Sequence, residues 1–291
     1  MSELEHVLAV SNELGEGPLW IAEEQALYWV DIPSQHIHRF YPSTGKHDSW
    51  EFDVMVTALG ARASGGFVAG TSNGLAFWDP ASPGLSFFAN PEAGEPSNRF
   101  NDGAVDAQGR FWAGTMNKDN PEAPDGALYR VDPDGSVHQM DTGFSCSNGG
   151  AWSPDSKTMY FTDTMRRVIW SYDFDADAGT ISNRRPFAQV PEEEGYPDGH
   201  IVDSEGFVWT GLWGGWKIVR YDPNGKIERE IRLPVQNITK CAFGGENLDE
   251  LYITTAWETL SDEERKSQPL AGGLFRVKVD VKGMTAPKFA G

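Results

Sequence analysis

Cysteine is nearly absent from this chain, since Cys146 and Cys241 are the only two in 291 residues. Two cysteines are too few for a disulfide framework and lack the paired spacing of a metal site. We therefore expect two buried, small hydrophobic side chains in a reducing compartment. The first ten residues, MSELEHVLAV, contain neither the basic n-region nor the apolar h-region of a signal peptide. No apolar run in the sequence approaches membrane-spanning length. These absences predict a cytoplasmic protein.

Basic residues are also scarce, because 24 Lys and Arg stand against 43 Asp and Glu, for a formal net charge of −19. Such a chain repels polyanions, so we expect no nucleic-acid partner and no membrane partner. There is no G-x-S-x-G, P-loop or C-x-x-C motif. The histidines lack zinc-type spacing, and His36 and His38, on an expected outer strand, are predicted to lie at the surface.

Gly, Trp and Asp are arranged in a repeat. The segments NDGAVDAQGRFWAGT from Asn101 and DGHIVDSEGFVWTGL from Asp198 share an apolar residue and a D-x-x-G turn at the same places. Related segments begin at Glu16, Thr57, Asn148 and Thr239. A third strand-like segment follows most of them, as in ALYRVDPDG and KIVRYDPNG. Units of this size are typical of propeller blades.

Six repeats predict an all-β fold, a six-bladed β-propeller that occupies residues 1–291 as one domain with a metal site in its central channel. The N-terminal HVLAV is expected to supply the outer strand that joins the last blade to the first. Only LSDEERKSQ, near Leu260, has the character of a short helix.

Polar residues begin every repeat, where the first strand of a blade runs nearest the propeller axis. These register residues, as we call them, are Glu16, Thr57, Asn101, Asn148, Asp198 and Thr239. Two carboxylates and two amides supply the hard oxygen ligands that Ca²⁺, Mg²⁺ and Mn²⁺ favour. The alternative is a water-filled polar channel without an ion.

Further candidates lie beside the register residues. Arg99 precedes Asn101 by two positions, so an extended strand directs both side chains the same way. It would hold a hydroxyl-rich or anionic substrate, or it would neutralise an acidic channel. Tyr196 and His200 flank Asp198, and Trp213 and Trp216 would either wall the channel mouth or pack inside a blade.

Segments along most of the chain carry a resemblance to a known family. GEGPLW, YWVDIP, NRFNDG, FWAGTM, GALYRVDPDG, SNGG, YPDG, CAFGG and AGGLFRV occur in the order in which they occur in the regucalcin/gluconolactonase family of sugar lactonases. The resemblance implies a metal-dependent hydrolase that opens an aldonolactone, such as glucono-, xylono- or arabinonolactone, to the aldonic acid. It implies a cytoplasmic monomer or small homo-oligomer whose partner is a small-molecule sugar lactone.

The resemblance also implies roles for particular residues. One divalent ion, calcium first and Zn, Mn, Mg or Fe as alternatives, would be held by Glu16, Asn148 and Asp198. Asp198 would also be the catalytic general base, with the ion polarising the lactone carbonyl. The substrate-binding residues would be Arg99, Asn101, Asp102 and Asp119.

Three departures from the family pattern lie where substrate would bind. The loop after AGTM reads NKDNPE, which leaves Asp119 as the nearest acidic residue, while LWGGW replaces a more polar segment and His200 follows YPDG. The identity of the lactone therefore does not follow from the resemblance.

Two other functions remain open from the sequence. A related propeller hydrolase would use a similar oxygen-ligand site to cleave phosphotriesters, with a second, structural ion. A non-catalytic calcium-binding regulatory protein would need neither Arg99 nor Asp198, and both residues are present.

Overall fold

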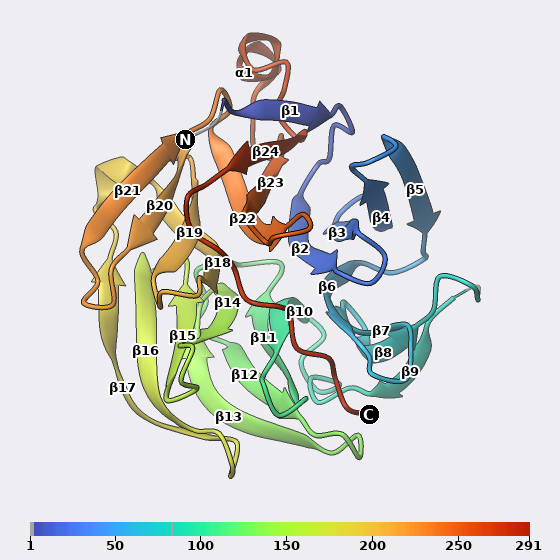
Figure 1. Cartoon of the computed structure of the whole chain (residues 1–291). Helices are drawn as coiled ribbons and strands as arrows, with labels where there is room; N and C mark the ends of the chain where they lie inside the picture. The colour runs from blue at the N-terminus through green and yellow to red at the C-terminus, as the bar shows by residue number, and fades with distance from the viewer. Residues whose placement is uncertain (1–2, 83) are drawn as a thin grey trace. The chain divides into compact units, whose positions relative to one another are not determined.

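The computed structural model of the chain describes residues 3–82 and 84–291, so residues 1–2 and 83 of the expected domain lie outside the described residues. In the described part, the strands form six antiparallel sheets of four strands each, and the one α-helix is α1 (Asp262–Ser267). Each sheet corresponds to one repeat, so the expected fold class, an all-β six-bladed propeller, is confirmed (Figure 1). No helix in this part of the chain is long and apolar enough to cross a membrane.

The first of two compact units comprises Met1–Glu51 and Val190–Thr285 and contains three of the sheets. Its strands, sheet by sheet, are β2 (Gly15–Ile21), β3 (Ala26–Asp31), β4 (His36–Tyr41) and β5 (Lys46–Glu51); β18 (Tyr196–Val202), β19 (Val208–Trp213), β20 (Lys217–Tyr221) and β21 (Ile227–Arg232); and β22 (Asn237–Gly244), β23 (Glu250–Ala256), β24 (Leu274–Lys278) and β1 (Glu5–Leu8). A short 3₁₀ helix, η1 (Glu192–Glu194), precedes β18.

The second compact unit comprises Phe52–Gln189 and Ala286–Gly291 and contains the other three sheets. Its strands are β6 (Val56–Ala61), β7 (Phe67–Thr71), β8 (Gly74–Trp78) and β9 (Ser86–Ala89); β10 (Asn98–Val105), β11 (Phe111–Asn117), β12 (Gly126–Val131) and β13 (Val137–Phe144); and β14 (Ser147–Trp152), β15 (Thr158–Asp163), β16 (Val168–Asp175) and β17 (Thr180–Gln189).

The two ends of the chain are tied into sheets. Strand β1 lies at the outer edge of the last sheet, antiparallel to β24, with Glu5 opposite Arg276 (Figure 1). This pairing confirms that the N-terminal segment supplies the outer strand of the last blade. At the other end, Phe289 is completely buried in the core of the second unit, where it forms a parallel bridge with Arg62.

The repeated D-x-x-G turn owes its form to one aspartate side chain. Asp203 accepts hydrogen bonds through Oδ1 from the backbone N–H groups of Glu205 (2.9 Å) and Phe207 (3.0 Å), which fixes the turn. Its Oδ2 accepts a hydrogen bond from Nε1 of Trp209 at 2.8 Å. Asp106 bonds Trp112 in the same way at 2.9 Å, so the D-x-x-G-x-x-W spacing in the sequence reflects a repeated structural lock.

Three histidines gather on β4 and β5, contrary to the expected surface position of His38. The His38 ring is buried, stacks on Trp29 at 5.0 Å between ring centroids, and its Nδ1 lies 3.0 Å from Nε2 of His47. His36 also stacks on the His38 ring, at 5.7 Å between ring centroids, and is partly buried. The expectation fails for His38 because a neighbouring aromatic side chain covers this strand, which strand order alone does not reveal.

This histidine cluster predicts a loss of stability in acid. Burial lowers the pKa of His38 to about 3, and burial also lowers the pKa of His47. An unfolded histidine titrates near 6.5, so between pH 6.5 and 3 the unfolded chain binds a proton that folded His38 does not. The free energy of unfolding should therefore decrease as the pH is lowered through this window, by about 1.4 kcal/mol per pH unit for His38.

Urea denaturation at pH 7 and at pH 5 measures this loss. The loss should be smaller in His38→Gln, and it should keep its wild-type size in His138→Gln, which changes an exposed histidine. An unchanged loss in His38→Gln would contradict the role of His38.

Candidate functional site

The six register residues lie at or within the same irregularity of the first strand of each sheet. Each lies on the first strand of its sheet, and in the described part of the chain each is buried despite being polar. The pairing between the first and second strands shifts at this point in every sheet, for example between Glu16 and Leu19 and between Pro197 and His200. Such bulges redirect side chains and are frequent next to active sites. Glu16 and Asn148 are the last paired residues before the shift, and the other four register residues lie within it, so the repeat alignment made from the sequence is correct to within one residue.

Glycines after two register residues make these irregularities possible. Gly17 has φ of 58° and Gly149 has φ of 74°, a left-handed backbone that side chains with a Cβ disfavour. The E-G and N-G pairs of the sequence therefore mark the bulges after Glu16 and Asn148.

In the first unit, two carboxylates occupy the register. Glu16 on β2 accepts a hydrogen bond from the Gly17 N–H at 2.9 Å, and Asp198 lies on β18. The third register residue, Thr239 on β22, donates its hydroxyl proton to the Gly15 carbonyl oxygen at 2.5 Å. Thr239 thus holds the strand that carries Glu16.

Two buried basic side chains follow these register residues in the first unit. His200 is buried on β18, opposite Thr210 of β19. Lys240 on β22 is also buried, and its aliphatic stem fills the space that a Cβ on Gly199 would need. The sequence singled out His200, whereas Lys240 was not recognised because nothing local distinguishes it from a surface lysine.

In the second unit, the predicted site residues form one hydrogen-bonded series. Nη1 of Arg99 donates to Oδ1 of Asn101 at 2.6 Å. Nδ2 of Asn101 donates to Oδ1 of Asn148 at 3.0 Å and to the Ser147 carbonyl oxygen at 2.9 Å. Nδ2 of Asn148 donates in turn to Oγ1 of Thr164 at 2.9 Å. Because the Asn101 nitrogen faces the Ser147 carbonyl oxygen, which only accepts, the same nitrogen must meet the oxygen of Asn148; this fixes the Asn148 amide, and its Oδ1 retains capacity for a second partner.

Asp102 and Asp119 differ in their surroundings. Asp102 is buried and accepts hydrogen bonds from the backbone N–H groups of Gly103 (2.7 Å) and Gly149 (2.9 Å), which links β10 to β14. Asp119 is exposed in the loop after β11, and its backbone N–H donates to Oδ1 of Asn117. The structure therefore brings Arg99, Asn101, Asp102 and Asn148 together, with Asp119 on a separate loop.

The remaining residues from the sequence analysis lie around these strands. Trp213 ends β19 opposite Tyr196, and Trp216 is 38% exposed in the following turn. Cys241 is buried as expected, whereas Cys146 is only partly buried and its sulfur lies 3.7 Å from Nδ2 of Asn148.

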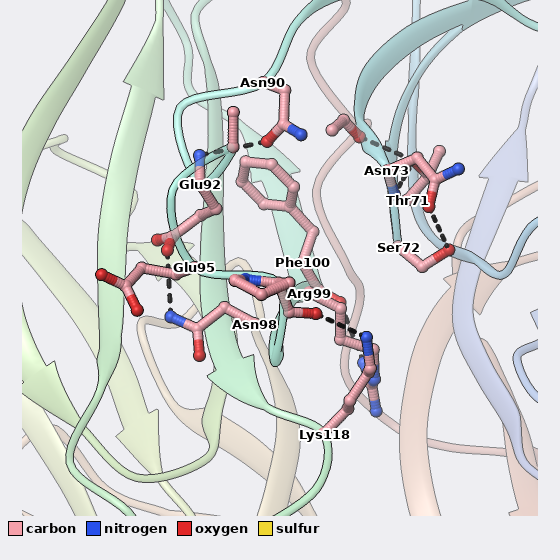
Figure 2. A pocket seen from close by; sticks show the side chains of 13 residues that line it. Thr71, Ser72, Asn73, Asn90, Glu92, Glu95, Asn98, Arg99, Phe100 and Lys118 are labelled. Atoms are coloured by element: carbon pink, nitrogen blue, oxygen red, sulfur yellow. Dashed lines mark hydrogen bonds between the residues drawn. The ribbon is translucent and has the colours of Figure 1, made fainter.

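A pocket of about 400 Å³ opens against Arg99 in the second unit. Figure 2 shows Ser72 and Asn73 on one side, Asn90, Glu92, Glu95 and Asn98 on the other, and Phe100, Arg99 and Lys118 between them. The sequence analysis did not identify this pocket. The polar, turn-rich runs TSNG and NPEAGEPSN were visible there, but nothing in the sequence placed them against each other.

The donor atoms of the register suit a hard cation. Glu16 and Asp198 contribute carboxylate oxygens and Asn148 an amide oxygen, and all three side chains are buried. Oxygen donors of this kind are those that Ca²⁺ and Mg²⁺ bind. Among the described residues, no group of three or more His, Cys, Asp or Glu side chains is placed to hold a metal ion.

Known proteins resemble this chain over nearly its whole length. The family described as SMP-30/Gluconolactonase/LRE-like region matches residues 14–257. The putative sugar lactone lactonase YvrE of Bacillus subtilis is 37% identical, covering 96% of this chain and 95% of that protein. The pentonolactonase XacC of Haloferax volcanii is 35% identical, covering 95% and 94%. The solved structure of a calcium-binding protein, regucalcin, from Agrobacterium tumefaciens is 28% identical, with a TM-score of 0.93 over 97% of this chain and 96% of that one.

Proposed function

The chain belongs to the SMP-30/gluconolactonase/LRE-like family and is a lactone hydrolase, and we propose that it opens a sugar lactone with the help of one divalent cation. The observation that carries this proposal is the set of buried oxygen donors at the bulged register of the blades. Because Glu16 and Asp198 belong to one compact unit and Asn148 to the other, the proposal takes residues 1–291 as one functional domain.

The proposed ligand set is Glu16, Asn148 and Asp198. Calcium is the first candidate, as the calcium-binding regucalcin relative suggests, with Zn, Mn, Mg and Fe as alternatives. When bound, the cation would supply Lewis-acid polarisation of the lactone carbonyl. Two carboxylates would balance its charge.

The chain's own residues would perform the remaining steps. Asp198 would accept a proton as water adds to the lactone carbonyl carbon, and the bond from that carbon to the ring oxygen then breaks. The departing ring oxygen takes up a proton and becomes the free hydroxyl of the aldonic acid. The Arg99 guanidinium would donate to substrate hydroxyls while Asn101 holds it in place through the 2.6 Å hydrogen bond.

Asn101 has a second part in this proposal. Its amide nitrogen is used by Ser147 and Asn148, and its Oδ1 accepts from Arg99, so a substrate hydroxyl would meet the second lone pair of Oδ1. Asp102, which bonds two backbone N–H groups, would act on substrate from a fixed position, and Asp119 would reach it from its exposed loop. A cytoplasmic location and a monomeric or small oligomeric state complete the proposal.

A metal add-back assay tests the function. Protein stripped of metal should fail to acidify a pH-indicator solution of pentono- or hexonolactone, and one or more of Ca²⁺, Mg²⁺, Mn²⁺, Zn²⁺ and Fe²⁺ should restore lactone opening. The same ion should raise the melting temperature, since an ion that binds the folded state alone stabilises it.

Each alternative function predicts a different result. Thermal stabilisation by an ion with no turnover of any lactone would favour a non-catalytic calcium-binding protein. Hydrolysis of a phosphotriester in preference to every lactone would favour a phosphotriesterase. If no metal restores lactone opening, the proposed function is wrong.

A further inference from the structure

The pocket beside Arg99 is separate from the proposed metal ligands but connected to them. Its volume of about 400 Å³ lies within the roughly 300–1,000 Å³ range of small-molecule sites. Arg99, which lines it, is joined to Asn148 through Asn101 by hydrogen bonds of 2.6 Å and 3.0 Å. A lactone whose carbonyl lies near Asn148 and whose hydroxyls meet Arg99 would therefore extend toward this pocket.

One wall of the pocket is held firmly in place by Glu92. Its Oε1 accepts hydrogen bonds from the hydroxyls of Thr115 (2.9 Å) and Tyr129 (2.8 Å), and its Oε2 accepts one from Nδ2 of Asn98 (2.9 Å). The Glu92 backbone N–H is bound by Oδ1 of Asn90 at 3.1 Å (Figure 2). The loop between β9 and β10 is thus preorganised rather than loose, which lowers the entropic cost of binding a ligand.

The lower edge of the pocket is tied in the same manner. Nζ of Lys118 donates to the Pro96 carbonyl oxygen at 2.7 Å, and the Lys118 backbone N–H donates to the Ser97 carbonyl oxygen at 2.8 Å. Lys118 thus fastens the loop after β11 to the loop before β10.

The lining favours a neutral, hydroxyl-rich ligand. Two cations, Arg99 and Lys118, are balanced by two carboxylates, Glu92 and Glu95, so the lining has no formal net charge in a chain of net charge −19. The amides of Asn73 and Asn90 offer both donors and acceptors, as sugar hydroxyls require. An anionic ligand would face the carboxylates, and a cationic ligand would face Arg99 and Lys118.

We propose that this pocket is a subsite for a second sugar ring, so that the enzyme acts on lactones of disaccharide aldonic acids. The inference rests on the proposed lactone hydrolysis and adds a substrate class to it. The pocket is too large for the single hydroxymethyl group by which a hexonolactone exceeds a pentonolactone. A glycosidically linked ring would bring several hydroxyls to the lining residues.

Steady-state kinetics with gluconolactone and cellobionolactone tests this subsite. We expect wild-type kcat/KM for cellobionolactone to equal or exceed that for gluconolactone. Asn73→Trp, which fills the pocket from the β7–β8 turn, should lower kcat/KM for cellobionolactone by about tenfold or more and change gluconolactone opening less than about twofold. Asn224→Trp, in an exposed turn far along the sequence, should alter neither value.

A second variant covers the case in which Asn73→Trp does not fold. Lys118→Met keeps the length of the side chain and removes its donors, and it should reduce cellobionolactone opening selectively. The subsite is refuted if wild-type enzyme opens gluconolactone but turns over cellobionolactone at less than about a tenth of that kcat/KM, or if the variants affect both lactones equally. If the enzyme instead preferred a lactone that carries a carboxylate group, the pocket would be an anion site and the proposed sugar subsite would be refuted. Failure to open any lactone would instead overturn the proposed function, and the inference with it.

Discussion

Asp198→Asn should reduce kcat for lactone opening by about 10²–10⁴-fold, the loss expected when a general base is removed. The substitution keeps the size of a buried side chain and retains one oxygen that could contact a cation. The fold should therefore persist, and the loss should appear in the chemistry. Asp177→Asn, at an exposed position, is the matched control and should leave kcat unchanged.

Metal titration of the Asp198→Asn variant separates the two roles proposed for this residue. If Asp198 is only a ligand, a large excess of the activating cation should restore kcat. If it is the base, the variant should remain slow when thermal stabilisation shows the cation site to be saturated. Activity near that of the wild type at ordinary metal concentration would remove Asp198 from the mechanism.

Asp203→Ala should lower the free energy of unfolding by about 3–5 kcal/mol, the cost of breaking a buried ion pair from one side. Asp203 is completely buried and accepts hydrogen bonds from Arg220 through Nε (2.9 Å) and Nη2 (2.7 Å), in addition to its bonds to Trp209 and to the turn. Its removal leaves a buried guanidinium and an indole N–H without this acceptor. Arg220 keeps Glu205 and Glu228, so we expect the lower end of the range.

Asp222→Ala is the matched control for the Asp203 substitution. Asp222 fixes a turn of the same form, accepting hydrogen bonds from the backbone N–H groups of Asn224 (2.8 Å) and Lys226 (3.0 Å), but it is partly exposed. Its loss should cost much less than the loss of Asp203, because water can replace the hydrogen bonds of an unburied carboxylate. Equal costs for the two substitutions in urea denaturation would show that the turn, and not the buried lock, accounts for the effect.

The repeat made the blades and the register predictable. D-x-x-G turns and alternating apolar positions act over a few residues, so their spacing could be read without tertiary structure. The six register residues, found by aligning repeats, coincide with the bulges of the first strands. Their assignment to metal, base and substrate contact came from the family resemblance and remains a prediction.

Other features depended on contacts between distant segments. The burial of His38 arises from Trp29 and His47 on neighbouring strands, and a strand pattern does not show which ring covers which. The role of Thr164 is similar, because its bond to Asn148 crosses from the end of one strand to another strand of the sheet.

The sequence by itself determined the blade period, the D-x-x-G turns and the polar register, because each is encoded in short-range spacing. Only the tertiary structure decided that Arg99, Asn101, Asn148 and Thr164 form one hydrogen-bonded series and that two polar loops enclose a pocket at Arg99. The physical reason is that the Asn101–Asn148 bond joins adjacent sheets, the Asn148–Thr164 bond joins two strands of one sheet, and the pocket loops come from separate parts of the chain. Their geometry is set by how the sheets pack, and no local pattern records it.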